Sequence, residues 1–83
     1  MKTAKEMFEE QGFILKEETK SYIRYFRKFL DYGSGDYVSF DLKNKRFRLT
    51  NKTLQGNVSF RYAGVKELKA INKQVEELGW LDD

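Results

Sequence analysis

Apolar residues at both ends of the chain recur every three or four positions, which is the spacing of an amphipathic helix. Near the N-terminus this face comprises Ala4, Met7, Phe8 and Gln11. Towards the C-terminus it comprises Val65, Leu68, Ile71, Val75 and Leu78. Thr3 and Glu6 have the spacing of a capping box, which marks the start of the first helix. The pattern predicts one helix at each end of the chain, each with its apolar face buried.

Both predicted helices end at a glycine that an aromatic residue follows. Gly12 and Gly79 occupy these positions, where glycine adopts a left-handed conformation without steric cost. The residue after such a glycine commonly packs back on the helix. Phe13 is therefore expected to contact Phe8, and Trp80 is expected to cover the end of its own helix rather than to contact a partner.

Between the predicted helices the hydrophobic period changes to two, as expected of strands with one buried face. Three segments alternate in this way, with the apolar sets Val38, Phe40 and Leu42, then Phe47 and Leu49, then Val58, Phe60 and Tyr62. A turn at residues 43–45 and a loop at residues 51–57 would connect these strands. Short connections between consecutive strands favour an antiparallel meander.

Residues 21–30 have an ambiguous pattern. Ile23, Phe26 and Leu30 would suit a helical face, but the many β-branched and aromatic residues favour a strand. Residues 32–36 would then form a loop, and residues 13–17 are an optional further short strand that the predicted order does not count. The predicted fold is a single α+β domain over residues 1–83, ordered α-β-β-β-β-α, with an antiparallel meander sheet covered on one face by the N- and C-terminal helices.

The composition excludes several kinds of chemistry. The 83 residues include no Cys and no His, so the chain lacks zinc-thiolate sites, disulfides and the usual general base. Eight of the 13 acidic residues occur as adjacent pairs, at residues 9–10, 17–18, 76–77 and 82–83. Neighbours on a helix point about 100° apart, so such pairs do not form a catalytic dyad. Residues 33–35, Gly-Ser-Gly, lack the Gly-Lys-Ser/Thr ending of a phosphate-binding loop. We expect no enzymatic activity, no cofactor and no bound metal.

Two further absences bear on localisation. No stretch approaches the roughly 18 apolar residues that a membrane span requires. No charged segment followed by an apolar stretch marks a signal peptide. The sequence therefore predicts a cytoplasmic protein that does not enter a membrane.

Positive charge is concentrated in the middle of the chain. Residues 20–62 hold ten Lys and Arg against three Asp, a net charge of +7, whereas residues 1–19 and 63–83 each have a net charge of −2. The uncovered sheet face would gather a candidate binding set of Tyr22, Arg24, Phe26, Arg46, Arg48 and Arg61. A shift of one residue in the first of these strands would instead present Tyr25 and Arg27, because such a shift exchanges the two faces.

Two interpretations of this basic face are open. The arginines are ordinary solvated strand residues whose aliphatic stems cover the sheet. Alternatively, the guanidinium groups bind the phosphates of single-stranded nucleic acid while the rings stack on its bases. The motifs of the common nucleic-acid-binding folds are absent from the sequence.

Three segments have a distinctive sequence: TAKEMFEE at residues 3–10, FDLKNK at residues 40–45 and LKAINKQVEELGW at residues 68–80. In these segments the chain resembles a group of small uncharacterised proteins encoded by phages and prophages of Gram-positive bacteria. The resemblance implies an intracellular α+β protein without assigned catalytic residues. Such products often bind a host protein or a nucleic acid, and this expectation is an analogy.

The missing catalytic groups, the small size and the expected exposed aromatic residues favour a non-catalytic interaction module. Tyr, Trp and Arg dominate the energetics of protein interfaces, so a protein partner is the first hypothesis. The alternative hypothesis is nucleic-acid binding through the basic, aromatic-bearing sheet face. The sequence does not specify the oligomeric state.

Overall fold

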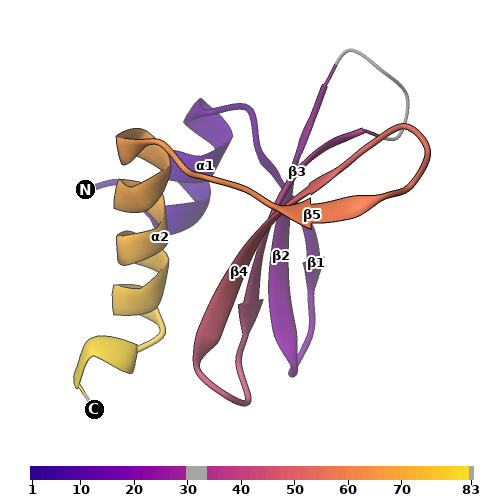
Figure 1. Cartoon of the computed structure of the whole chain (residues 1–83). Coiled ribbons are helices and arrows are strands. Elements are labelled where there is room, and N and C mark those ends of the chain that lie inside the picture. The colour runs from indigo at the N-terminus through magenta and orange to yellow at the C-terminus, as the bar shows by residue number, and fades with distance from the viewer. Residues whose placement is uncertain (30–33, 83) are drawn as a thin grey trace.

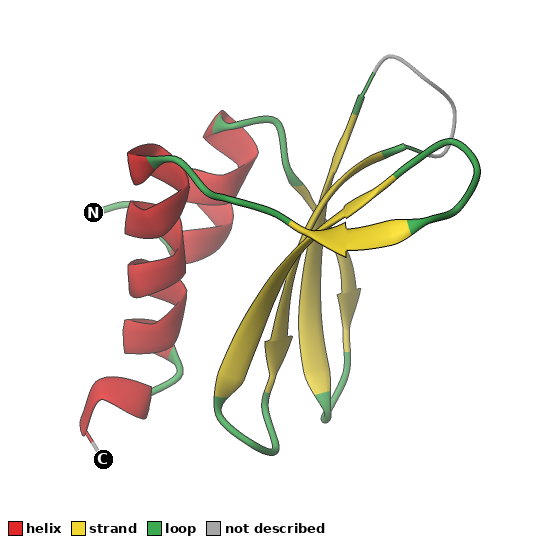
Figure 2. Cartoon of the chain, viewed as in Figure 1, coloured by secondary structure: helices red, strands yellow, loops and turns green. Residues whose placement is uncertain are grey.

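A computed structural model describes residues 1–29 and 34–82. In chain order the elements are helix α1 (Ala4–Glu10), strands β1 (Ile14–Glu18), β2 (Tyr22–Lys28), β3 (Gly35–Asp41), β4 (Arg46–Lys52) and β5 (Val58–Phe60), helix α2 (Val65–Glu77) and the 3-10 helix η1 (Trp80–Asp82). The strands form one antiparallel sheet in the order β1-β2-β3-β4-β5. The predicted α+β meander is confirmed (Figures 1 and 2).

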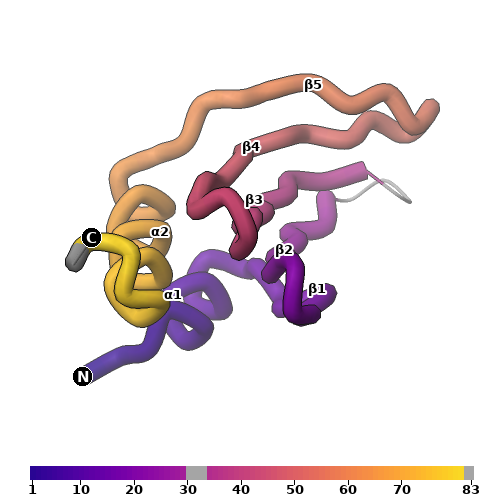
Figure 3. The backbone as a smooth tube through the Cα atoms, turned by 90° about the horizontal axis from the view of Figure 1, so that it is seen from below, coloured from indigo at the N-terminus to yellow at the C-terminus, as the bar shows by residue number. Residues whose placement is uncertain are grey.

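The two helices lie side by side on one face of the curved sheet (Figures 1 and 3). They run antiparallel, because the first residue of α1 meets the end of α2 and the end of α1 meets the first turn of α2. The Ala4 amide donates to the Glu77 carboxylate at 2.8 Å. The Gln11 side-chain amide donates to the Lys66 carbonyl at 2.9 Å. No described element covers the opposite face of the sheet.

The hydrophobic core fills the space between the helices and the sheet. Its buried members are Phe8, Phe13, Ile23, Tyr25, Val38, Phe40, Ala70 and Ile71. The Phe8 ring stacks on the Tyr25 ring at 4.1 Å between centroids. The Tyr25 hydroxyl donates to the Gln74 side-chain oxygen at 2.7 Å, so the core contains one satisfied polar link between β2 and α2.

The predicted helix ends are confirmed. Thr3 and Glu6 form a reciprocal capping box. Gly12 has a φ of +90°, and the Phe13 amide donates to the Phe8 carbonyl at 3.0 Å, which is the closing bond of a Schellman motif. The Phe13 ring meets the Phe8 ring edge-on at 5.6 Å, as expected from their spacing.

Helix α2 also ends at a left-handed glycine. Gly79 has a φ of +76°, and its amide donates to the Glu76 carbonyl at 3.0 Å. Trp80 is half-buried against the core, with its ring 6.3 Å from the ring of Phe40. Trp80 is therefore a packed residue, as predicted, and its ring contact is with β3.

Residues 22–28 form a strand, which decides the ambiguous segment in favour of the strand interpretation. Leu30 and residues 32–33 of the predicted loop lie outside the described residues. Gly35 and Asp36 were expected in that loop but begin β3, where they pair with Lys28 and Arg27. A β-carbon on Gly35 would lie 2.3 Å from the Arg27 carbonyl oxygen, so this strand position requires glycine. Beside Gly35, β4 extends through Lys52 into the predicted 51–57 loop.

One predicted core face is wrong and another is only partly right. Val58, Phe60 and Tyr62 were expected to face the core, but all three are exposed. On the predicted buried face of the C-terminal helix, Ile71 is buried and Val75 and Leu78 pack against the core, whereas Val65 and Leu68 are exposed. Glu67, Ala70 and Gln74 are the other buried positions of α2. The helix is turned about its axis so that Glu67 and Gln74 reach polar partners on the sheet side.

Candidate functional sites: the open sheet face and an exposed apolar segment

The sheet face opposite the helices, here called the open face, is built from cross-strand rows. The row nearest the β3–β4 turn contains Tyr22, Asp41 and Arg46. The next row contains Arg24, Ser39 and Arg48. The third row contains Phe26, Tyr37, Thr50 and Phe60. Successive rows are two residues apart, so they share one face, while the intervening Ile23, Tyr25, Val38 and Phe40 point into the core.

Five of the six predicted binding residues therefore share the open face: Tyr22, Arg24, Phe26, Arg46 and Arg48. The predicted register of β2 is correct, and Tyr25 and Arg27 lie on the helix side. The sixth residue, Arg61, directs its guanidinium group to Glu67 of α2, on the helix side of the sheet.

Arg24 is held by neighbours on three sides. Its guanidinium group pairs with the Glu17 carboxylate at 2.9 Å, donates to the Ser39 hydroxyl at 3.3 Å and lies 4.9 Å from the centre of the Tyr22 ring. The Tyr22 hydroxyl donates to Glu17 at 2.7 Å, and this bond raises the pKa of Tyr22. The Glu17 charge is thus compensated within the sheet.

Arg46 is paired with the carboxylate that organises the β3–β4 turn. Asp41 accepts hydrogen bonds from the Lys43 and Asn44 amides at 3.2 Å each, from the Asn44 side chain at 2.9 Å and from Arg46 at 3.0 Å. The bond from the Asn44 side chain, with help from the Asn44 amide and Arg46, lowers the pKa of Asp41 to about 2. The Arg46 side chain nevertheless remains 73% exposed.

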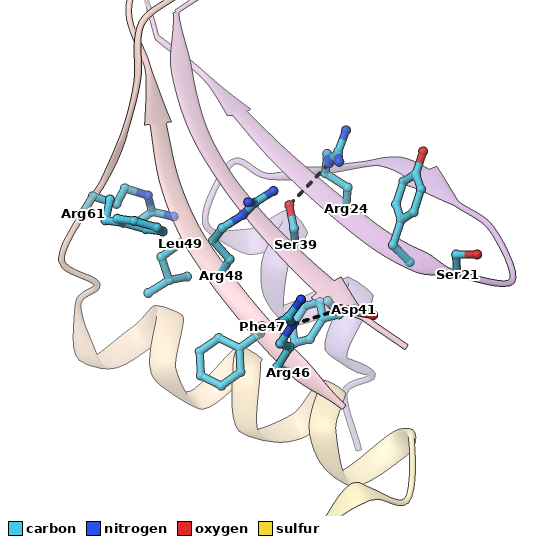
Figure 4. Close-up of a pocket in the computed structure, with 12 residues that line it drawn as sticks. Ser21, Arg24, Ser39, Asp41, Arg46, Phe47, Arg48, Leu49 and Arg61 are labelled. Atoms are coloured by element: carbon cyan, nitrogen blue, oxygen red, sulfur yellow. Dashed lines mark hydrogen bonds and ion pairs between the residues drawn. The ribbon is translucent and has the colours of Figure 1, made fainter. Parts of the chain in front are cut away.

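Arg48 lies in the middle of this face and is exposed. It makes no hydrogen bond or ion pair with any residue in the described ranges 1–29 and 34–82. A hollow of about 800 Å³ opens beside it, and Arg24, Ser39, Arg46 and Phe60 also line that hollow. Figure 4 shows Arg24, Ser39 and Arg48 on one side of the sheet, whereas Phe47 and Leu49 point towards α2.

The third row is partly covered. The Lys16 ammonium group lies 4.8 Å from the centre of the Phe26 ring and 5.1 Å from that of Tyr37. It also lies within hydrogen-bonding distance, 3.1 Å, of the Tyr37 hydroxyl. Phe26 is therefore already occupied by a cation and is a poor platform for a stacked base, whereas Phe60 is 81% exposed.

Arg61 belongs to a buried ionic network on the helix side of the sheet, which corrects its predicted place on the open face. Its guanidinium group bonds to Glu67 and to the backbone carbonyls of Tyr37 and Thr50, and it lies 3.5 Å from Asp36. The cause is the register of β5. Phe60 pairs with Thr50 on the open side, so the next side chain turns inward. The alternation identified the two sides of this segment but assigned the apolar side to the core, and no pattern in the sequence pointed to Glu67 as the partner of Arg61.

The segment from β5 into α2 exposes five apolar side chains that sequence analysis did not assign to a surface. This exposed apolar segment comprises Val58, Phe60, Tyr62, Val65 and Leu68. Tyr62 is 99% exposed. Cations border the segment: Arg48 and Lys52 share the sheet face of Val58 and Phe60, and Lys69 follows Leu68 in α2.

Within the described ranges, no group of three or more acidic side chains is placed to hold a metal ion. Among the described helices, none combines the length and the apolar character needed to cross a bilayer. No protein-family model matches the chain, and no curated protein and no solved structure is significantly similar to it.

Proposed function

We propose that the protein is a small non-catalytic module that binds a partner protein through the exposed apolar segment. The observation that carries the proposal is that all five side chains follow the periodicity of core residues yet lie uncovered. The five side chains lie within eleven residues of the chain, and exposed apolar side chains that gather on a surface commonly mark an interaction site. Aromatic residues are enriched at such sites because they bury a large area for little loss of conformational freedom.

The charges around the segment indicate the chemistry of the partner. Arg48, Lys52 and Lys69 border it, whereas its nearest acid in the sequence, Glu67, is buried and paired. Interfaces place potentials of opposite sign against each other. The partner surface that fits is apolar and bordered by acidic residues.

The test compares the wild-type chain with the double variant Phe60→Ser/Tyr62→Ser. Ile14→Ser is the matched control, because Ile14 is an exposed apolar residue at the opposite edge of the sheet. Each protein is immobilised, exposed to a bacterial extract, and then titrated with any captured protein after that protein has been purified.

We expect direct binding by the wild type and by Ile14→Ser, and a loss of at least about tenfold in affinity for the double variant. Light scattering on the purified wild type measures whether the protein associates with itself. A dimer that the double variant cannot form would show that a second copy, and not another protein, covers the segment. Absence of both binding and self-association would contradict the proposal.

The second candidate function is nucleic-acid binding, and one observation favours it: Arg24, Arg46 and Arg48 share an uncovered sheet face with the exposed ring of Phe60. The neutralising pairs with Glu17 and Asp41 limit the net positive charge of that face. Fluorescence anisotropy with a labelled single-stranded oligonucleotide should show binding at about 50 mM salt that weakens steeply as salt is added. An anisotropy that stays flat at that salt concentration would contradict this function.

The sequence resemblance to small phage and prophage proteins is consistent with either partner class, and a cytoplasmic phage-type protein stays our proposal for its origin. The resemblance covers the helix ends and the β3–β4 turn, which shape the fold. It does not cover the exposed residues of β5, so it does not choose between the two functions.

A further inference from the structure

We propose that the row of Arg24, Ser39 and Arg48 is a binding site for a phosphate group. The inference rests on the second candidate function and deepens it by naming the atoms that would hold the ligand, and none of the three residues belongs to the exposed apolar segment. The three residues are direct cross-strand neighbours on β2, β3 and β4. Adjacent strands lie about 4.8 Å apart, so the two arginine backbones flank Ser39 at about 10 Å from each other.

The hydrogen-bonding capacity of the row is only partly used. Arg24 spends one N–H group on Glu17 and another on Ser39, which leaves the remaining guanidinium N–H groups available. The Ser39 oxygen accepts from Arg24, so the Ser39 hydroxyl hydrogen is free to donate, and it has no acceptor among the described residues. Arg48 retains all five of its N–H donors. The unused donors therefore come from three side chains that share one side of the sheet.

This donor set suits a phosphate better than a carboxylate. A carboxylate is planar and is satisfied by one guanidinium group in a fork-to-fork pair. A phosphate presents three or four oxygens in a tetrahedral array, so it can take one guanidinium group from each side and a hydroxyl from below. The nearby carboxylates do not repel such an anion strongly, because Glu17 is paired with Arg24 and Tyr22 while Asp41 is paired with Arg46 and Asn44.

The surroundings of the row allow the phosphate to carry an organic group. The adjoining hollow, about 800 Å³, is far larger than a phosphate alone, and the rings of Tyr22 and Phe60 line it. An exposed ring beside a phosphate site can stack on a nucleobase. The phosphate can therefore belong to a free pyrophosphate-like anion or to a single-stranded oligonucleotide, and separate titrations distinguish these two sources.

The test uses the full chain and two probes, sodium pyrophosphate followed by amide NMR shifts and a fluorescein-labelled single-stranded oligonucleotide followed by anisotropy. The variants are Arg48→Gln and Ser39→Ala. Lys69→Gln is the matched control, because it removes the same charge from an exposed position on α2. Circular dichroism checks that each variant is folded. We expect Arg48→Gln to fold normally, because the Arg48 side chain is exposed.

We expect pyrophosphate to shift the amides of Ser39 and its cross-strand neighbours. Arg48→Gln should weaken binding of both probes about tenfold, Ser39→Ala should weaken it severalfold, and Lys69→Gln should weaken it less than twofold. Equal losses for Arg48→Gln and Lys69→Gln would overturn the proposal, since they would indicate attraction by net charge alone.

Failure of the phosphate site and failure of nucleic-acid binding give different results. Binding of pyrophosphate at the row without binding of the oligonucleotide would support the phosphate site and contradict nucleic-acid binding. Oligonucleotide binding that Arg48→Gln and Ser39→Ala leave unchanged would support nucleic-acid binding and overturn the site. Binding of neither probe at low salt would overturn both.

Discussion

The guanidinium group of Arg61 makes a two-pronged pair with the carboxylate of Glu67, with bonds of 3.1 and 2.5 Å. The side chains are only 12% and 4% exposed. The pair ties the connection between β5 and α2 to the sheet, because the same guanidinium group bonds to the Thr50 carbonyl at 2.9 Å and lies beside Asp36. It also fixes which face of α2 is buried.

Arg61→Ala should destabilise the fold by about 3–5 kcal/mol, since it leaves the buried carboxylate of Glu67 without its cation, whereas Asp36 keeps its pair with Arg27 at 2.6 Å. Glu67→Gln should cost less, because the amide still accepts a hydrogen bond. Urea denaturation followed by circular dichroism measures both. Arg46→Ala is the control, and this exposed pair should contribute less than about 1 kcal/mol. Similar losses for Arg61→Ala and Arg46→Ala would contradict the structural role of the network.

Tyr25→Phe should make stability less sensitive to alkaline pH. Burial, with the charges of Glu77, Glu18 and Glu9, raises the pKa of Tyr25 to about 12 from an ordinary value of 10.0. The folded chain therefore binds more protons than the unfolded chain between about pH 10 and 12. This contribution to stability is complete below pH 10 and is lost as the pH rises through about 12.

At neutral pH the same substitution should cost about 1–3 kcal/mol, because the side-chain oxygen of Gln74 loses its buried donor. Thermal unfolding from pH 8 to pH 12 separates the two effects: the gap between wild type and Tyr25→Phe should narrow above pH 10. A gap that stays constant across this range would show that Tyr25 does not titrate as a buried group.

Asp41→Asn should reduce the loss of stability in acid. The pKa of Asp41 is lowered from 3.8 to about 2, so between these values the folded chain binds fewer protons than the unfolded chain. The Asp41 contribution is therefore present above about pH 4 and is lost as the pH falls through about 2. Thermal unfolding from pH 6 to pH 2 should show wild type and variant converging, and a difference that stays constant over this range would contradict the contribution of Asp41.

Gly35→Ala should destabilise the sheet by about 1–3 kcal/mol through steric overlap. A β-carbon there would lie 2.3 Å from the Arg27 carbonyl oxygen and 2.5 Å from the Phe26 ring. Gly64→Ala is the matched control, because nothing lies within 4 Å of a β-carbon at that position. Denaturation midpoints for the two variants provide the comparison, and equal midpoints would mean that the strand relaxes around the added methyl group.

The helix ends could be predicted because they depend on interactions within a few residues. The Thr3–Glu6 capping box and the left-handed Gly12 and Gly79 satisfy backbone groups that no distant residue is needed to complete. The strands were also predicted from local alternation, and β2 was correctly favoured over a helix. The extra strand residues Gly35 and Asp36 were missed because glycine and aspartate have low strand propensity, which cross-strand pairing with β2 overrides.

The apolar spacing predicted the buried face of α2 only in part, because Ile71, Val75 and Leu78 pack on the core but the first turn does not follow the pattern. Val65 and Leu68 have the right period, but the helix instead buries Glu67 and Gln74. The reason is tertiary: Arg61 and Tyr25 supply partners that make burial of these polar groups favourable. Periodicity shows which side chains share one face of the helix. It does not show whether distant residues supply polar partners that favour burial of another face.

The sequence by itself determined the order of elements, the caps and the alternation within each strand, because these depend on backbone conformation and nearest neighbours. It also gave the core side of β2, β3 and β4, whereas only the tertiary structure decided which side of β5 and of the first turn of α2 meets the core. Cross-strand register brings Arg24, Ser39 and Arg48 into one row and sends Arg61 to the opposite side, although all three arginines occupy similar strand positions in the sequence. Register and ion pairing involve residues far apart in the chain, so their outcome depends on the packed fold as a whole.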